Sequence, residues 1–366
     1  MRLRPRRSSD GGIQEARGGE GEGPEVRVQR RRNRRQLLRR GIRLGGLLQV
    51  KEGSLRYRAK APGKVILLGE HFVVHGNPAL AAALDRGVEA VAEEGDEDIV
   101  ASEDLRLSSP ISKPAEGLAP LCASISKLLS DFGRRGVKVT LRSSIPVSAG
   151  LGSSASSAVA ALSAVSGLFD LRLDDEALFD YAMISERMVH ENPSGVDVYV
   201  AVHGGLVYFQ RSKKRSVSLA QRFPIVVCCT GSSRRTGDMV ARVAAFKEAS
   251  PETYRTWATA SSKLVEDCAR ALEEGKYELL AQAMNFHHMA LKAMGVSTPE
   301  LDSLVREARS IGFSGAKLTG GGGGGCMIAL PTRGDEVKLF HTFNAKHPNS
   351  FLSYIPSEGV RCWSTK

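Results

Sequence analysis

The sequence predicts an α+β protein with two domains, preceded by a basic extension. The chain has 366 residues, 42% of them hydrophobic and 25% charged, an ordinary composition for a globular protein of this length. From residue 55 onward, short strand patterns alternate with helical patterns, and the second half is richer in helix. We expect an extension over residues 1–53, an N-terminal domain over residues 54–220 and a C-terminal domain over residues 221–366.

The net charge of +11 is concentrated in the extension. Residues 1–51 hold 15 Lys and Arg against 5 acidic residues, which leaves 36 basic and 35 acidic residues for the remainder. The folded part is therefore nearly neutral, and nucleic acid is not the expected partner for it. The arginine clusters of the extension are mixed with Gly and Glu and lack periodicity, which predicts disorder, whereas a basic arm for RNA or anionic lipid is the alternative.

Cysteine usage and hydropathy indicate a cytoplasmic protein. The six cysteines form no CxxC pair, and no secretory signal precedes them, so we expect reduced thiols. The apolar stretches, such as residues 79–84 and 155–168, are too short or too rich in serine to cross a membrane.

The first half of the folded part begins with strands and continues with helices. Strand patterns cover residues 55–59, 65–68, 87–92 and 137–141. Apolar residues recur at helical spacing over residues 118–132 and stop at Gly133. Residues 155–168 form an alanine-rich helical pattern, and Asp174 is the predicted N-cap of a helix that reaches about residue 190.

The second half contains three long helical patterns and two strands. The helical pattern over residues 238–275 is interrupted near Pro251, because proline lacks a backbone donor, and the next pattern covers residues 277–294. A third helix follows Thr298 and Pro299 and ends before Gly312. Strands over residues 316–319 and 326–330 flank a run of six glycines.

The clearest functional signal is a loop of glycine and serine that opens a helix. It runs from Gly150 to Ser157 after a strand. Glycine allows the backbone to approach a ligand closely, and the free N–H groups and positive dipole of a helix N-terminus favour a polyphosphate. No Gly-Lys-Ser/Thr follows, so the loop is not a Walker A motif. A plain turn that caps a buried helix is the alternative for the loop alone.

Two other segments carry charged residues that could take part in phosphoryl transfer. The segment Lys60 to Gly76 carries Lys64, Glu70, His71 and His75 near the ends of a strand, and no metal site is expected there because ligands at metal spacing are missing. Glu186 and Asp197 flank a tight turn eleven positions apart. Phosphoryl transfer uses one carboxylate to hold Mg²⁺ and another to orient or deprotonate the attacking hydroxyl.

These segments, in this order, together resemble the GHMP kinase family over about residues 55–330. The resemblance implies a two-domain fold with an N-terminal domain like ribosomal protein S5 domain 2 and a ferredoxin-like C-terminal domain. Within the family, residues 62–76 and Pro193-Ser-Gly-Val-Asp197 resemble the version found in members that act on mevalonate. Gly321 is a departure, since the family usually has Ala there.

The resemblance also implies residue roles. Asp197 would be the catalytic base, Lys64 its cationic partner, and Glu186 with Ser154 the Mg²⁺ ligands. Other residues would bind phosphate (Gly150, Leu151, Gly152, Ser153, Ser154), contact the substrate (Glu70, His71, Asp197, Thr236) or close the site as a glycine-rich loop (Gly320, Gly321, Gly322, Gly323). Arg234 and Arg235 are candidates for the cation that receives a substrate carboxylate.

The implied reaction is ATP-dependent phosphorylation of the 5-hydroxyl of (R)-mevalonate, with Mg²⁺ as the metal. Another small-molecule kinase of the family stays open, acting on phosphomevalonate, on the 3-hydroxyl of mevalonate or on a sugar. A noncatalytic module that binds nucleotide or RNA is the remote alternative, and Lys64, Glu186 and Asp197 argue against it. The sequence leaves a homodimer open.

Overall fold

The computed structural model describes residues 56–365 except 147–148, 191–192, 211–212, 220 and 233–235, and for Thr236 it describes the backbone only. The described residues form two β-sheets, one of eight strands and one of four, with helices packed on each. The predicted extension over residues 1–53 lies outside the described residues. The α+β class is confirmed.

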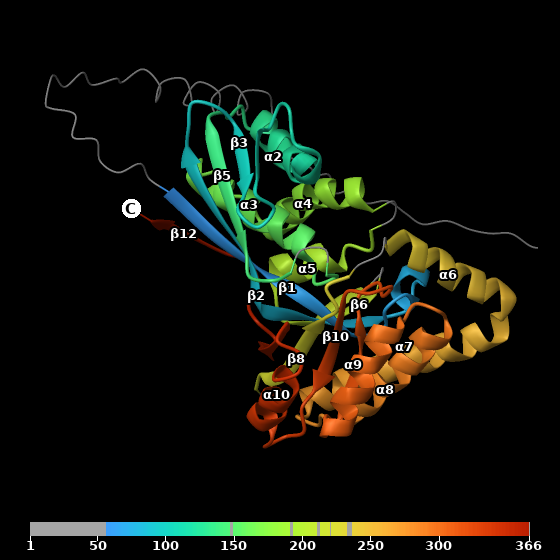
Figure 1. Ribbon diagram of the computed structural model, residues 1–366. Helices are drawn as coiled ribbons and strands as arrows, with labels where there is room; N and C mark the ends of the chain where they lie inside the picture. The colour runs from blue at the N-terminus through green and yellow to red at the C-terminus, as the bar shows by residue number, and fades with distance from the viewer. Residues whose placement is uncertain are drawn as a thin grey trace, which may run out of the picture. The chain divides into compact units, whose positions relative to one another are not determined.

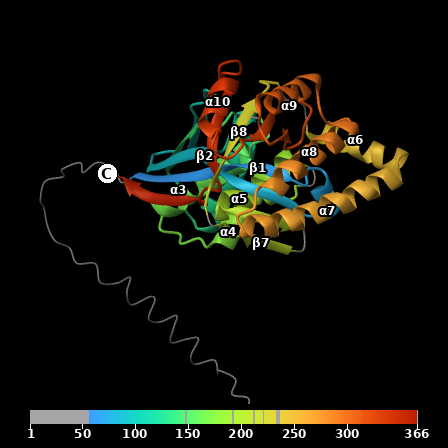
Figure 2. The ribbon, with the colours of Figure 1, turned by 90° about the horizontal axis from the view of Figure 1, so that it is seen from below.

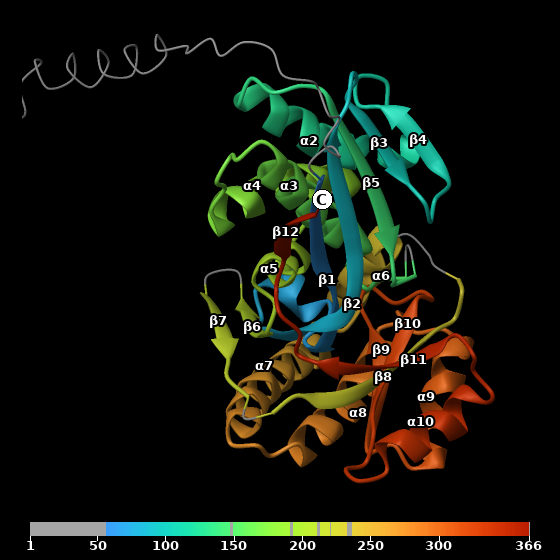
Figure 3. The same cartoon turned by 90° about the vertical axis from the view of Figure 1, so that its left-hand side faces the viewer.

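The larger sheet is built around the long pair of β1 and β2. Its main path runs β12, β1, β2, β5, β3, β4, and β6 joins β2 and carries β7 (Figure 3). Only β3 and β5 are parallel among the described pairs. The strands are β1 (Arg56–Leu68), β2 (Ala79–Glu94), β3 (Ile99–Ser102), β4 (Leu107–Pro110), β5 (Val137–Ser143), β6 (Leu206–Gln210), β7 (Lys213–Val217) and β12 (Arg361–Thr365).

The strands predicted over residues 55–59 and 65–68 are parts of one strand, β1. The pairing with β2 continues through the turn-like residues Pro62 and Gly63, and the register shifts between Pro62 and Lys64. The interruption in the sequence therefore marks a bulge, which is how a sheet accommodates a proline without ending the strand. This bulge lies next to Lys64, one of the predicted site residues.

Four helices cover one face of the larger sheet (Figure 1). They are α2 (Ala119–Asp131), α3 (Ser153–Leu168), α4 (Asp175–Val189) and α5 (Val196–His203). Two short 3₁₀ segments also occur: Phe72–His75 follows β1, and Glu116–Leu118 precedes α2. The small side chains of α3 let it pack directly on β1 and β2, and it is buried along most of its length. The predicted cap at Asp174 is confirmed, because its side chain accepts from the Ala177 N–H.

The smaller sheet is antiparallel, in the order β11, β8, β10, β9. Its strands are β8 (Phe223–Cys229), β9 (Gly315–Thr319), β10 (Cys326–Leu330) and β11 (Ser350–Ile355), and its helices are α6 (Thr236–Ala249), α7 (Pro251–Glu273), α8 (Glu278–Ala293), α9 (Pro299–Ile311) and α10 (Glu336–Asn344). Helices α7 and α8 lie side by side (Figure 2). The predicted interruption at Pro251 and the predicted helix start near Pro299 are confirmed, and the Thr298 side chain caps α9 by accepting from the Leu301 N–H.

The end of the chain returns to the larger sheet. Strand β12 pairs with β1, from Arg56 opposite Thr365 to Lys60 opposite Arg361. Residues 361–365 therefore complete the sheet of the first half, although the sequence assigned them to a domain over residues 221–366. The division at residue 220 stays a prediction. No helix in the described part of the chain is long and apolar enough to cross a membrane.

Candidate active site

The glycine and serine loop leads directly into the N-terminus of α3. Gly150 and Gly152 have φ values of 79° and 76°, in the left-handed region that glycine adopts without steric penalty. No side chain caps the helix at Gly152, which leaves the first N–H groups of α3 for a ligand. Ser153 and Ser154 form the first turn. The arrangement suits an anion such as a phosphate.

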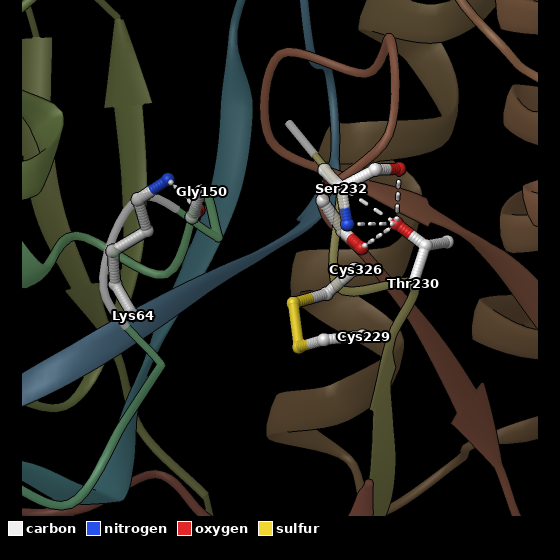
Figure 4. Close-up of a disulfide and its surroundings, with 7 residues drawn as sticks. Lys64, Gly150, Cys229, Thr230, Ser232 and Cys326 are labelled. Carbon is white, nitrogen blue, oxygen red and sulfur yellow. Dashed lines mark hydrogen bonds between the residues drawn. A yellow bond between two sulfur atoms is a disulfide. The ribbon is translucent and has the colours of Figure 1, made fainter. Parts of the chain in front are cut away.

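Lys64, on β1, connects the segment from Lys60 to Gly76 to this loop. Its backbone N–H donates to Leu151 O at 2.9 Å, and its Nζ donates to Gly150 O at 3.1 Å (Figure 4). A Cβ on Gly152 would lie 3.0 Å from the Lys64 side chain, so glycine is needed for this approach. The lysine side chain is only 5% exposed. Its charge is thus fixed beside the phosphate loop.

The same ammonium group pairs with Asp197. The distance from Lys64 Nζ to Asp197 Oδ1 is 3.3 Å, and the aspartate is 28% exposed, so it is accessible to a substrate. Asp197 lies in the first turn of α5, and this helix begins directly after Gly195, whose φ of 81° sets the turn. Sequence positions 64, 150 and 197 therefore meet at one point.

Glu186 is a buried carboxyl at the same place. It lies on α4, is 4% exposed, and interacts with the Ser154 hydroxyl. Burial raises the pKa of Glu186 to about 7, and the negative charge of Asp197 contributes to the same shift. Its Oε1 atom is buried and has no hydrogen-bond partner. An unsatisfied carboxylate oxygen beside a second carboxylate is a typical signature of a cation site.

The residues around Glu186 fit Mg²⁺. Magnesium prefers oxygen ligands and is usually held by one or two carboxylates together with waters and substrate phosphates. Glu186 Oε1 and the Ser154 hydroxyl supply such oxygens next to the predicted phosphate loop. Among the described residues, no group of three or more His, Cys, Asp or Glu side chains could hold a metal ion. A bound Mg²⁺ would therefore also need waters or substrate phosphates as ligands.

The glycine-rich loop between β9 and β10 packs against the phosphate loop. A Cβ on Gly320 would lie 3.0 Å from Gly150 O, and a Cβ on Gly325 would lie 3.0 Å from Ala149 O. A Cβ on Gly322 would lie 2.2 Å from Val296 O. These approaches exclude side chains at Gly320, Gly322 and Gly325.

Glu70 and His71 stand between β1 and the glycine-rich loop. Glu70 is 1% exposed and His71 is 6% exposed. The His71 Nε2–H donates to Gly321 O at 3.0 Å, and burial lowers the pKa of His71 to about 4, so the ring is neutral at pH 7. His71 has a φ of 61°, which is rare for a residue with a side chain and is found at functional sites.

The partner of Glu70 is Lys317, which is not among the predicted site residues. Its Nζ contacts Glu70 Oε1, and both side chains are buried. The signal was present in the sequence: Lys317 is the single charged residue in β9, where all five residues are buried. A buried lysine needs an anionic partner.

The expectation of reduced thiols is wrong for one pair. Cys229 and Cys326 form a disulfide, while Cys122, Cys228, Cys268 and Cys362 are free. The two cysteines are register partners on β8 and β10 (Figure 4). Thr230 and Ser232 exchange backbone hydrogen bonds with Gly325. The disulfide thus joins the end of β8 to the start of β10, where the glycine-rich loop ends.

Three predicted residues cannot be placed. Arg234, Arg235 and the side chain of Thr236 lie outside the described residues. A cavity of about 420 Å³ opens beside the glycine-rich loop, lined by Ser232, Arg242, Ser297, Thr298, Pro299, Glu300 and Gly323. Since it contains neither Lys64 nor the two carboxylates, we place the candidate site at the Lys64 cluster and not at this cavity.

The sequence matches two protein-family models. They are the GHMP kinases N terminal domain, over residues 121–205, and the GHMP kinases C terminal domain, over residues 268–349. It is 37% identical to the mevalonate kinase of Thermococcus gammatolerans over 331 residues, covering 84% of this chain and 98% of that protein. It is 38% identical to the mevalonate kinase of Pyrococcus furiosus over 327 residues, covering 83% and 97%.

The structure is also similar to solved structures of mevalonate kinases. The structure of L. major mevalonate kinase in complex with R-mevalonate is 29% identical, with a TM-score of 0.71, and the match covers 82% of this chain and 95% of that one. The Methanococcus jannaschii mevalonate kinase is 27% identical, with a TM-score of 0.71 and coverage of 86% and 98%. Lactococcus lactis galactokinase, at 18% identity and a TM-score of 0.69, shares the fold.

Proposed function

We propose, because the chain belongs to the GHMP kinase family, that it transfers the γ-phosphate of ATP to the 5-hydroxyl of (R)-mevalonate, forming 5-phosphomevalonate and ADP. The observation that carries the chemistry is the Lys64–Asp197 pair at 3.3 Å beside the phosphate loop. The choice of mevalonate is supported by the relatives, several of which are mevalonate kinases at 35–38% identity.

Asp197 is the proposed base. It is the accessible carboxylate of the site, and it would accept the proton of the 5-hydroxyl while that oxygen bonds to the γ-phosphorus and the bond to the β-phosphate breaks. Lys64 holds Asp197 in place and offsets the negative charge that develops on the attacking oxygen. The N–H groups at the start of α3, together with Gly150, Leu151, Gly152 and Ser153, would bind the ATP phosphates.

Glu186 and Ser154 would hold Mg²⁺. Bound there, the metal would neutralise charge on the phosphate oxygens. Glu70, His71 and Thr236 are the proposed substrate contacts, and the loop from Gly320 to Gly323 would close the site. The neutral state of His71 suits a hydrogen bond better than an ion pair with the substrate carboxylate.

A substrate screen tests this proposal. The measurement is ADP release from ATP and Mg²⁺ with mevalonate, phosphomevalonate, galactose, homoserine or shikimate, followed by ³¹P and ¹H NMR of the product. We expect turnover with mevalonate and a phosphate on C5. Turnover only with a sugar, or a phosphate on C3, would contradict the assignment.

Asp197→Asn tests the mechanism separately from the substrate. The variant keeps the shape of the side chain and removes the base, so kcat should fall by about 10²- to 10⁴-fold while ATP binding is retained. Circular dichroism verifies the fold. A variant with nearly wild-type kcat would remove Asp197 from the proton transfer.

Two further expectations from the sequence stay part of this proposal. One is a homodimer, which sedimentation velocity would detect. The other is a cytoplasmic location. The Cys229–Cys326 disulfide is unusual for a reducing cytosol, although intracellular proteins of hyperthermophilic archaea commonly contain disulfides.

A further inference from the structure

Lys317 is a buried lysine that the proposed mechanism does not use. Its side chain is fully buried; β9 pairs with β10, and the Lys317 ammonium reaches Ile66 on β1. An ammonium group has three donors, and the three acceptors around it are Glu70 Oε1, Leu318 O at 2.6 Å and Ile66 O at 3.4 Å. Desolvating a charge costs several kcal/mol even in a paired state, so a sequence that needed only stability would place an apolar residue here.

Its partner Glu70 is satisfied on one side only. Oε1 faces Lys317, whereas Oε2 is buried without a hydrogen-bond partner. A structural glutamate would use both oxygens, because leaving one buried and unpaired is unfavourable. Glu70 is also next to His71, whose ring donates to the glycine-rich loop at Gly321.

A second contact ties the same two segments together. The Thr319 hydroxyl donates to Ile66 O at 3.1 Å and accepts from the Ile66 N–H at 3.0 Å. Lys317 and Thr319 thus fasten β9 to β1 on either side of Leu318. This anchoring lies at the strand end from which the glycine-rich loop begins.

No other cation among the described residues can replace Lys317. Apart from each other, the groups that interact electrostatically with Lys317 or Glu70 are Lys64, His71, His287 and His288. Lys64 is paired with Asp197. Burial lowers the pKa of His71 to about 4, of His287 to about 3 and of His288 to about 4, so all three rings are neutral at pH 7.

We propose that Lys317 is a positioning residue for the reaction: it holds Glu70 as a carboxylate, with Oε2 free for a hydroxyl of the substrate, and fixes it relative to the glycine-rich loop. The inference rests on the proposed function, since it assumes a hydroxylated substrate at Glu70. Burial raises the pKa of Glu70, and the charge of Lys317 is the main influence that lowers it. Without Lys317, the pKa of Glu70 rises further, so a smaller share of the carboxyl is ionised at a given pH.

The test is Lys317→Met, which keeps the length of the side chain and removes its charge. At pH 7 we expect kcat/KM for mevalonate to fall by about tenfold or more, because a smaller share of Glu70 is ionised and an ionised acceptor makes the stronger hydrogen bond. As the pH rises above 7, kcat/KM should recover through an ionisation that the wild type lacks in this range. A packing defect alone would lower activity without adding this ionisation.

The double variant Glu70→Gln with Lys317→Met identifies the ionising group. It should lack the new ionisation and match Glu70→Gln alone within about threefold, because Lys317 acts through Glu70. Lys276→Met is the matched control: Lys276 is exposed and paired with Glu274, so its loss should leave activity unchanged.

Three outcomes would overturn the inference. They are a wild-type pH profile in Lys317→Met, persistence of the new ionisation in the double variant, or a double variant about tenfold or more below Glu70→Gln. If Lys317→Met does not fold, the inference is tested by comparing kcat/KM of the double variant with that of Glu70→Gln. The double variant can still fold, since it buries no unpaired charge. A wild-type protein inactive on mevalonate would refute the proposed function instead, and the same comparison would then use the substrate found in the screen.

Discussion

Reduction of the Cys229–Cys326 disulfide should lower the thermal midpoint of the protein by about 7 °C. The perturbation is a dithiol reductant, which opens the bond without deleting an atom. Cys229 and Cys326 are 97 positions apart in the chain, so the bond closes a long loop in the unfolded state. In the chain-entropy description, a loop of this length stabilises the folded state by about 4.7 kcal/mol.

The midpoint shift follows from the unfolding entropy. Unfolding releases about 2.1 cal/mol/K per residue, or about 0.6 kcal/mol/K for a folded unit of roughly 300 residues. Dividing 4.7 kcal/mol by this entropy gives about 7 °C. The hydrogen bonds between Thr230, Ser232 and Gly325 remain after reduction, so kcat at 25 °C should change little.

The assay combines thiol counting with thermal unfolding. The denatured, unreduced protein should show four free thiols out of six cysteines, and six after reduction. Cys362→Ser is the control, because Cys362 is an exposed free cysteine and its loss should not change the effect of the reductant. Cys326→Ala should reproduce the lowered midpoint without reductant.

Two results would refute this reasoning. Six free thiols in the unreduced protein would mean that the disulfide is absent. Four thiols with midpoints within about 1 °C before and after reduction would mean that the bond does not restrict the unfolded chain as assumed.

Three further predictions concern the metal, pH and a helix cap. Glu186→Gln should raise the Mg²⁺ concentration for half-maximal activity by at least about tenfold; an unchanged Mg²⁺ dependence would remove Glu186 from the metal site. Burial lowers the pKa of His287 from 6.5 to about 3, so the unfolded chain binds a proton that the folded chain does not, and stability falls as the pH drops below about 6.5. From pH 7 to pH 5 this loss is about 2 kcal/mol, and His287→Asn should lack it in urea unfolding; equal losses in both proteins would contradict the assignment. Thr298→Ala should destabilise the protein by about 1 kcal/mol because Thr298 caps α9, whereas Thr298→Ser should not; equal effects would argue against the cap.

The sequence was sufficient where function depends on local patterns. The loop that opens α3 was predictable because glycine, serine and a following helix are contiguous, and the start of α9 because Thr298 and Pro299 adjoin the helix. The Lys64–Asp197 pair was expected from the family resemblance. Its partners are 133 positions apart, so no periodicity could have revealed the contact.

The disulfide and the pairing of β12 with β1 could not be predicted, because both depend on which strands pair and in which register. Cys326 faces Cys229 because β8 and β10 pair in one register, and a shift of one residue would place Cys228 opposite it. Cys228 instead opposes Met327 and projects to the other face of the sheet. The pairing of β12 with β1 is of the same kind, since it joins the two ends of the described chain.

Gly321 shows how the structure explains a departure from the family. Gly320, Gly322, Gly323, Gly324 and Gly325 all have positive φ, whereas Gly321 does not. The backbone at Gly321 therefore does not require glycine, and the part of this residue that the site uses is its carbonyl, which accepts from His71. Because an alanine carbonyl would accept the same bond, the alanine that is usual in the family and the glycine of this chain can serve the same role. The five glycines around it are instead needed for their backbone conformation, so substitutions there should be far less tolerated than at Gly321.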